Sequence, residues 1–123
     1  MKTIAIIGAS ADRNKFGNKA VRAYTDLGYK VYPVHPKEKT IEGHKAYATL
    51  GEVPEKHLNM VSFYLTPEVG MKVLPQLKAK QIDELWLNPG SESDELIGAA
   101  EAQGLNVIPA CSIVAGGKRP SDY

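Results

Sequence analysis

The chain has 123 residues, of which 43% are hydrophobic and 24% charged, a composition typical of one soluble globular domain. Fifteen basic and fourteen acidic residues give a net charge of +1, which excludes a broad attraction to nucleic acid or anionic lipid. The single Cys111 excludes an internal disulfide and fits the reducing cytoplasm, and the three histidines lack zinc-site spacing. No apolar run has the length of a membrane span or signal peptide. We therefore expect one cytoplasmic domain over residues 1–123, with a tail at residues 115–123.

The first predicted element is a buried parallel strand over residues 3–7, which are apolar and mostly β-branched. Gly8 ends this strand and starts a loop of small and polar residues. An amphipathic helix begins at residue 17 or 18 and ends before Gly28, which suits the position after a helix C-terminus. The segment is thus a strand, a loop and a helix in series.

A second strand is predicted over residues 30–34. Its interior Pro33 has no N–H for the ladder, so we expect this strand near an edge of the sheet or paired on one side only at that point. A turn follows at residues 35–37. The next segment is ambiguous, since residues 45–48 suit a short strand or a loop between two glycine turns.

The second half of the chain predicts three more strands, over residues 60–65, 84–87 and 105–109. A helix over residues 67–80 has Thr66 as its N-cap and Pro67 in its first turn, and Pro75 should kink or shorten it. A second amphipathic helix covers residues 93–104. Strands and helices therefore alternate along the chain.

This alternation predicts an α/β fold of three layers with a mostly parallel sheet of about five strands, because right-handed crossovers put helices on both faces. Ligands of such folds bind at the carboxyl ends of the strands, near the topological switch point. The segments that architecture alone places there are residues 8–15, 35–39, 65–67, 87–92 and 110–112.

The loop after the first strand is a candidate phosphate site, since main-chain N–H groups meet phosphates there in many α/β proteins. Ser10 offers a hydroxyl, and Arg13 and Lys15 offer positive charge. The loop has neither the three glycines of a dinucleotide fingerprint nor the Gly-Lys-Ser/Thr of a P-loop. The alternative is a surface loop in which Gly8 only permits a tight turn.

The end of the second strand indicates which nucleotide is bound. NAD-binding folds place a carboxylate there to hold the ribose hydroxyls, whereas this chain has none before Glu38. Lys37 suits a phosphate on the ribose, as in NADP or in the 3′-phosphate of coenzyme A. The alternatives are that Lys37 is a solvated lysine and that His35 and Pro36 only form the turn.

Five motifs in order, IAIIGAS, VYPVHPK, FYLTPE, WLNPGSE and GLNVIPAC, resemble one family over about residues 3–115. They are similar to the small stand-alone CoA-binding-domain proteins with a Rossmann-like fold. The same domain forms the N-terminal part of the succinyl-CoA synthetase α subunit and of NDP-forming acyl-CoA synthetases. The resemblance implies that the cofactor is coenzyme A.

The resemblance also implies roles for four segments. Gly8-Ala9-Ser10-Ala11 matches the first phosphate-contacting turn, and Lys37 matches the basic residue near the adenosine 3′-phosphate. Leu65-Thr66-Pro67 matches the turn beside the adenine or pyrophosphate, and Asn88-Pro89-Gly90 matches the far side of the cleft. His35 departs from the pattern, because relatives usually have Asn before this proline.

The predicted function is binding of CoA or an acyl-CoA, without catalysis of its own. The synthetases also use a phosphorylatable histidine and an ATP-grasp module, which the printed sequence does not match. No Ser/His/Asp order or carboxylate pair indicates catalysis, and we expect His44 and His57 at the surface and Tyr64 and Trp86 in the core.

Two alternatives stay open at this point. One is an NADP-dependent or CoA-thiol redox enzyme that uses Cys111, which follows the last strand and either faces the cleft or is a buried core thiol. The other is a CoA-sensing interaction module for a separate ligase subunit.

Overall fold

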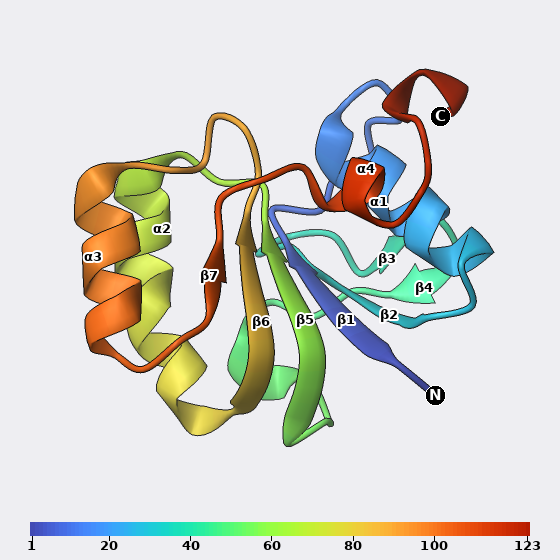
Figure 1. Cartoon of the computed structure of the whole chain (residues 1–123). Coiled ribbons are helices and arrows are strands. Elements are labelled where there is room, and N and C mark those ends of the chain that lie inside the picture. Colours follow the sequence, from blue (N-terminus) through green and yellow to red (C-terminus); the bar gives the residue numbers. More distant parts are fainter.

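The computed structural model describes residues 1–123 and has a five-stranded parallel sheet at its centre (Figure 1). The strands are β1 (Thr3–Ile7), β2 (Lys30–Val34), β5 (His57–Phe63), β6 (Gln81–Leu87) and β7 (Val107–Ile108). Their spatial order is β2-β1-β5-β6-β7, and every neighbouring pair is parallel. The Rossmann-like three-layer α/β fold is therefore confirmed.

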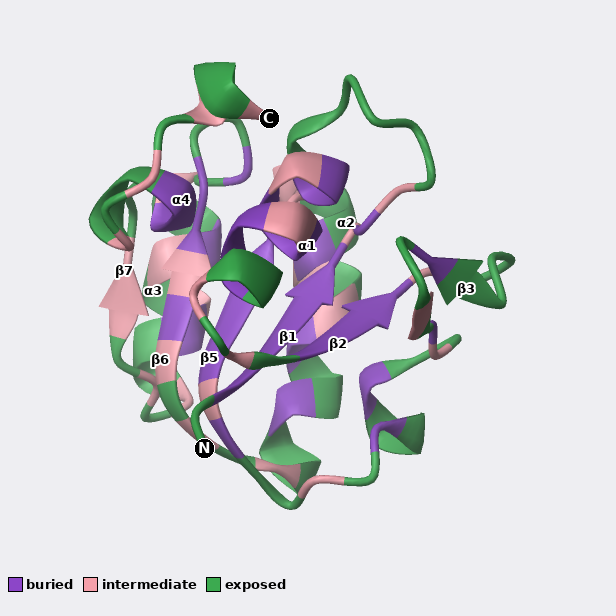
Figure 2. Ribbon diagram, turned by 90° about the vertical axis from the view of Figure 1, so that its right-hand side faces the viewer, coloured by how far each residue is buried: buried purple, intermediate pink, exposed green.

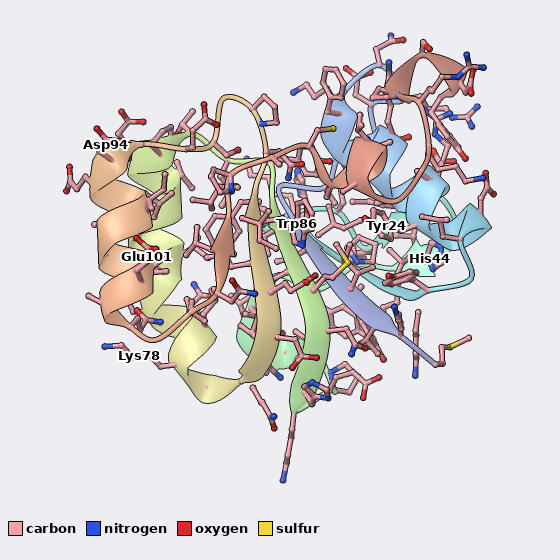
Figure 3. All side chains as sticks on the ribbon, in the orientation of Figure 1. Tyr24, His44, Lys78, Trp86, Asp94 and Glu101 are labelled. Carbon is pink, nitrogen blue, oxygen red and sulfur yellow. The ribbon has the colours of Figure 1, made fainter.

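Helices cover both faces of the sheet. They are α1 (Phe16–Asp26), α2 (Pro67–Val73), α3 (Asp94–Ala102) and the short α4 (Ser112–Ala115). Figure 1 shows α1 and α4 on one side of the sheet and α2 and α3 on the other. The charged side chains of Lys78, Asp94 and Glu101 point outward from the α2–α3 side and are exposed (Figure 3).

β1 lies between two strands and is buried on both faces, which explains its unbroken apolar run. Successive side chains of a strand point to opposite faces. Ile4 and Ile6 accordingly pack in the cluster under α1, whereas Ala5 and Ile7 pack in the cluster under α2 and α3. Figure 2 shows this central strand as buried along its labelled length.

The predicted edge position of β2 is confirmed. Pro33 pairs in register with Ile6 of β1, and β2 has no other neighbouring strand in the sheet. On its outer side, the Tyr47 N–H donates to the Pro33 carbonyl, and the Tyr47 carbonyl accepts from the His35 N–H, both at 2.9 Å. The ambiguous segment thus forms a small hairpin, β3 (Thr40–Ile41) and β4 (His44–Lys45), followed by a bridge from Tyr47 to Val34.

The predicted start and interruption of the second helix are also confirmed. Thr66 caps α2 by accepting a hydrogen bond from Val69 N–H at 3.4 Å, with Pro67 in the first turn. The α-helix ends before Pro75, and a 3₁₀ segment, Leu74–Ala79, replaces its predicted last turns. Proline cannot donate to the preceding turn, which accounts for this change.

The predicted end of the third strand is wrong in a way that matters for the site. β5 begins at His57 and ends at Phe63, so Tyr64 and Leu65 lie beyond the strand. The sequence also predicts a tail at residues 115–123. In the structure this segment follows α4 and turns back along α1, where the Tyr123 hydroxyl donates to Asp26 Oδ2 at 2.6 Å. None of the helices is both long and apolar enough to cross a lipid bilayer.

Candidate functional site

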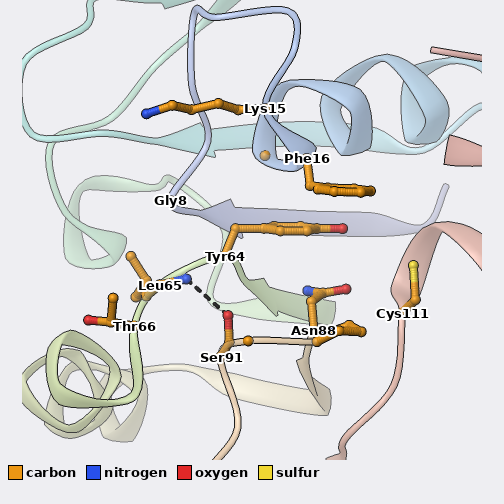
Figure 4. A pocket seen from close by; sticks show the side chains of 12 residues that line it. Gly8, Lys15, Phe16, Tyr64, Leu65, Thr66, Asn88, Ser91 and Cys111 are labelled. Carbon is orange, nitrogen blue, oxygen red and sulfur yellow. Dashed lines mark hydrogen bonds between the residues drawn. The ribbon is translucent and has the colours of Figure 1, made fainter. Parts of the chain in front are cut away.

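A cleft of ≈370 Å³ opens at the carboxyl edge of the sheet, where β1, β5 and β6 end (Figure 4). The chain leaves β1 toward α1 on one face and leaves β5 toward α2 on the other, so the cleft lies at the topological switch point. Its lining comes from five separate segments: Gly8, Lys15, Phe16, Gly17, Tyr64, Leu65, Thr66, Asn88, Pro89, Gly90, Ser91 and Cys111.

Two glycines allow three of these segments to meet. Gly8 has φ +93°, and a β-carbon there would lie 2.2 Å from the Tyr64 carbonyl oxygen. A β-carbon on Gly17 would lie 2.3 Å from the Gly8 carbonyl oxygen. The start of α1 therefore packs directly on the end of β1. The sequence analysis did not predict a role for Gly17 in the cleft. Gly17 lies nine residues after Gly8, a spacing that the dinucleotide fingerprint does not contain.

The start of α1 gives the cleft its positive end. No side chain caps this helix, and the N–H groups of Phe16 and Gly17 make no backbone hydrogen bond. The helix dipole adds partial positive charge at this end, and Lys15 adds a full charge. Free N–H groups, a lysine and a close glycine approach fit the phosphates of a nucleotide cofactor.

Asn88 forms the floor of the cleft from within the core. It is 1% exposed, and its amide Nδ2 donates to Ser62 Oγ and to the Phe63 carbonyl, both at 2.8 Å. Its Oδ1 accepts from Ser112 N–H at 2.9 Å. The side chain of Asn88 thus joins β5, β6 and α4. Both polar atoms of its amide are hydrogen-bonded within the protein.

Ser91 joins the two loops on the α2–α3 side of the cleft. Its hydroxyl donates to the Phe63 carbonyl at 3.1 Å and accepts from Leu65 N–H at 3.1 Å (Figure 4). Gly90, beside it, has φ +93° and donates its N–H to Glu92 Oε2 at 2.9 Å. These contacts fix the Leu65 turn against the Asn88–Ser91 loop. The sequence placed Ser91 in a ligand-facing segment but gave no sign of these partners.

Tyr64 and Cys111 line the α1 side of the cleft. The prediction that Tyr64 is a core strand residue was wrong, because its ring lies at the cleft wall (Figure 4). Its hydroxyl is 3.2 Å from Ser112 Oγ, and burial raises the pKa of Tyr64 to about 12, so the phenol is neutral. Cys111 is half-buried and lines the same cleft. Of the two alternatives for this thiol, facing the cleft or lying buried in the core, the structure has the first.

The segment after β2 lies outside this cleft. His35, Pro36 and Lys37 line a separate hollow of ≈480 Å³ that also contains Lys39 and Lys45. The Nδ1 atom of His35 accepts hydrogen bonds from Lys37 N–H at 3.0 Å and Glu38 N–H at 2.9 Å. His35 therefore holds the turn that presents Lys37. This is the alternative in which His35 only forms the turn.

The remaining predicted residues do not line the cleft. Ala9 is buried, Ser10 Oγ accepts from Asp12 N–H at 3.0 Å, and Arg13 pairs with Glu42 at 3.4 Å. Ala11 and Pro67 are likewise absent from the lining. From the predicted set, the cleft brings together Gly8, Lys15, Leu65, Thr66, Asn88, Pro89 and Gly90.

Comparison with known proteins matches the chain to a family described as CoA binding domain, over residues 2–117. The α subunit of acetate–CoA ligase [ADP-forming] II from Pyrococcus furiosus is 42% identical over 52 residues, 42% of this chain and 11% of the ligase subunit. Acetate–CoA ligase [ADP-forming] I from Archaeoglobus fulgidus is 24% identical over 121 residues, 89% of this chain. The chain spans only 18% of that ligase.

Among solved structures, a conserved hypothetical protein from Pyrococcus furiosus has the same fold, with a TM-score of 0.84 and 30% identity. The match covers 94% of this chain and 99% of that protein. The family match extends over nearly the whole chain and includes every segment that lines the cleft. The chain therefore belongs to the CoA binding domain family.

Proposed function

We propose that the cleft binds coenzyme A or an acyl-CoA. The observation that carries the proposal is the uncapped start of α1, which lines the same cleft as Tyr64 and Leu65. Lys15 lies there, and the N–H groups of the next two residues make no backbone hydrogen bond. CoA joins a phosphorylated nucleotide to a long, largely neutral arm. A cleft with one anion-binding end and an otherwise apolar wall suits both parts of such a molecule.

The lysines of the second hollow support a site there for the remaining phosphate. Lys37, Lys39 and Lys45 line it together with Glu38 and Glu52, and no acidic residue follows β2 before Glu38. Ribose hydroxyls favour a carboxylate at this position, whereas a ribose phosphate favours lysine. We propose that Lys37 contacts the 3′-phosphate of CoA while the pyrophosphate lies at the start of α1.

The proposal is one of binding without chemistry. The residues that line the cleft include no carboxylate and no histidine, and the Tyr64 phenol stays neutral at physiological pH. General acid–base catalysis needs a group that changes protonation near the working pH. The match covers only 11% and 18% of the two acetate–CoA ligases, so it gives no ground for assigning their whole activity to this chain.

The position of Cys111 favours one second candidate, a thiol–disulfide exchange in the cleft. The Cys111 thiolate would attack one sulfur of CoA disulfide, forming a Cys111–CoA disulfide and releasing one CoA thiolate. Incubation with CoA disulfide followed by intact-protein mass spectrometry tests it. The mass of one CoA should be added to the wild type and not to Cys111→Ser, and no adduct on the wild type would remove this candidate.

Isothermal titration of ligand-free protein with CoA, NADP and NAD tests the main proposal. We expect CoA to bind, and to bind more tightly than either dinucleotide. NADP bound more tightly than CoA would favour the dinucleotide redox alternative. The absence of CoA binding, or tighter binding of NAD, would overturn the proposal.

A further inference from the structure

Glu42 is the one non-glycine residue of the chain with a positive φ, +49°. It occupies the first position of the two-residue turn between β3 and β4, and Gly43 with φ +80° occupies the second. Such hairpin turns favour Asn, Asp or Gly at both positions, because other side chains are strained there. A glutamate at this position therefore needs a compensating contact.

The compensating contacts of Glu42 go to the first loop and to α1. Its carboxylate Oε2 accepts from Asn18 Nδ2 at 3.1 Å and pairs with Arg13 Nε at 3.4 Å. Asn18 is completely buried, and its Nδ2 also donates to the Ser10 carbonyl at 2.8 Å. Its Oδ1 accepts from Arg22 Nε at 2.7 Å. Glu42 thus completes a hydrogen-bond network that contacts the loop between β1 and α1 at both Ser10 and Arg13.

The hairpin itself does not depend on these contacts. Ile41 is buried in the core under α1, and His44 Nε2 lies 2.9 Å from Thr25 Oγ1 of that helix. Figure 1 shows β3 and β4 beside α1, consistent with these two anchors. The contacts of Glu42 are therefore available to hold the loop rather than the hairpin.

We propose that Glu42 is a positioning residue for the cleft, a role that rests on the proposed function. By fixing residues 10–13 of the loop, it holds the segment that presents Lys15 and the start of α1 to the ligand. A loop that is already ordered loses less conformational entropy when a ligand binds. The charge of Glu42 alone would repel an anion, so the positioning effect and the charge effect have opposite signs.

The substitution Glu42→Asn separates these effects, because Asn-Gly is the preferred pair for this turn and cannot form the Arg13 ion pair. Glu42→Gly, which removes the side chain, is the second variant. We expect both to keep or raise the thermal midpoint while weakening CoA binding about three- to tenfold. Hydrogen exchange at the Asp12 and Asn14 amides should also be faster in the ligand-free variants.

Glu101→Gln, on the exposed face of α3, controls for the change in net charge and should alter none of the three measurements. A lowered thermal midpoint in both variants would make Glu42 merely structural and overturn the inference. Unchanged affinity together with unchanged exchange would also overturn it. If the wild type does not bind CoA, the proposed function fails, and the exchange rates alone then decide whether Glu42 orders the loop.

Discussion

Gly17 lies so close to Gly8 that a β-carbon on Gly17 would stand 2.3 Å from the Gly8 carbonyl oxygen. This contact joins the helix that provides the free N–H groups to the strand that ends at the cleft. The spacing between the two glycines therefore controls where the anion-binding end of the cleft lies. Substitution at Gly17 tests this control.

Gly17→Ala should force α1 away from β1, with a loss of about 1–3 kcal/mol in the free energy of unfolding, as for other overpacked sites. CoA binding should weaken more than tenfold. Gly98→Ala on α3 is the matched control, because a β-carbon there meets no atom within 4 Å. Alanine in that helix should stabilise by about 0.5–1 kcal/mol and leave affinity unchanged. Chemical denaturation and calorimetric titration measure both, and equal behaviour of the two variants would contradict the packing argument.

Dephospho-CoA should bind more weakly than CoA if Lys37 contacts the 3′-phosphate. A charge-assisted contact of an exposed lysine contributes about 1–2 kcal/mol. In Lys37→Ala the difference between the two ligands should disappear, whereas in Lys45→Ala, from the same hollow, it should persist. Titration of both ligands into the three proteins completes the comparison. If only Lys45→Ala removes the difference, the phosphate lies at the other side of the hollow.

Asn88→Ala should be strongly destabilising, because it removes buried hydrogen bonds to β5 and leaves the buried Ser112 N–H of α4 without a partner. The lost bonds include those to Ser62 Oγ, the Phe63 carbonyl and Ser112 N–H. A loss of about 2–4 kcal/mol is expected for the loss of these buried hydrogen bonds together with one unpaired buried N–H. Asn106→Ala, at an exposed position, should cost less than about 0.5 kcal/mol. Urea denaturation distinguishes the two, and a similar small effect at both positions would mean that the network contributes little.

The elements were predictable where the cause is local. The apolar run of β1, the edge position imposed by Pro33, the Thr66 cap and the break at Pro75 each follow from neighbouring residues or from one residue's chemistry. Each of these features is present in the structure. Strand ends were less accurate, as Tyr64 shows, because burial on the α1 side and not strand propensity decides where that ring lies.

The site was predictable as a set of loops but not as a set of contacts. Gly17 contacts Gly8 through a carbonyl oxygen, which leaves no residue-type pattern beyond the glycine itself. Asn88 meets partners more than twenty residues away in the chain, and Glu42 meets Asn18 across a hairpin. Such pairings depend on tertiary packing. Tertiary packing likewise puts Lys15 and Lys37, both candidates for phosphate, in two separate hollows.

Tyr64 is one of two tyrosines, with Tyr24, whose burial should make the protein lose stability at alkaline pH. Burial raises the pKa of Tyr64 to about 12 in the folded chain, against an ordinary value of 10.0. The protonated Tyr64 phenol therefore contributes to the free energy of unfolding. This contribution is fully present below pH 10 and is lost as the pH rises toward 12. The slope for one proton approaches about 1.4 kcal/mol per pH unit. Denaturation between pH 8 and pH 11.5 should show a shallower fall for Tyr64→Phe, and identical slopes would contradict this account.

The central claim is that CoA binds in the cleft at the start of α1. The most direct measurement is a titration of ¹⁵N-labelled protein with CoA, followed by two-dimensional NMR of the backbone amides. The largest shift changes should fall on Gly8, Lys15, Gly17, Leu65 and Gly90, with a further group at Lys37 that is absent with dephospho-CoA. Saturating CoA that perturbs no amide, or perturbs only amides on the outer face of α3, would contradict the claim.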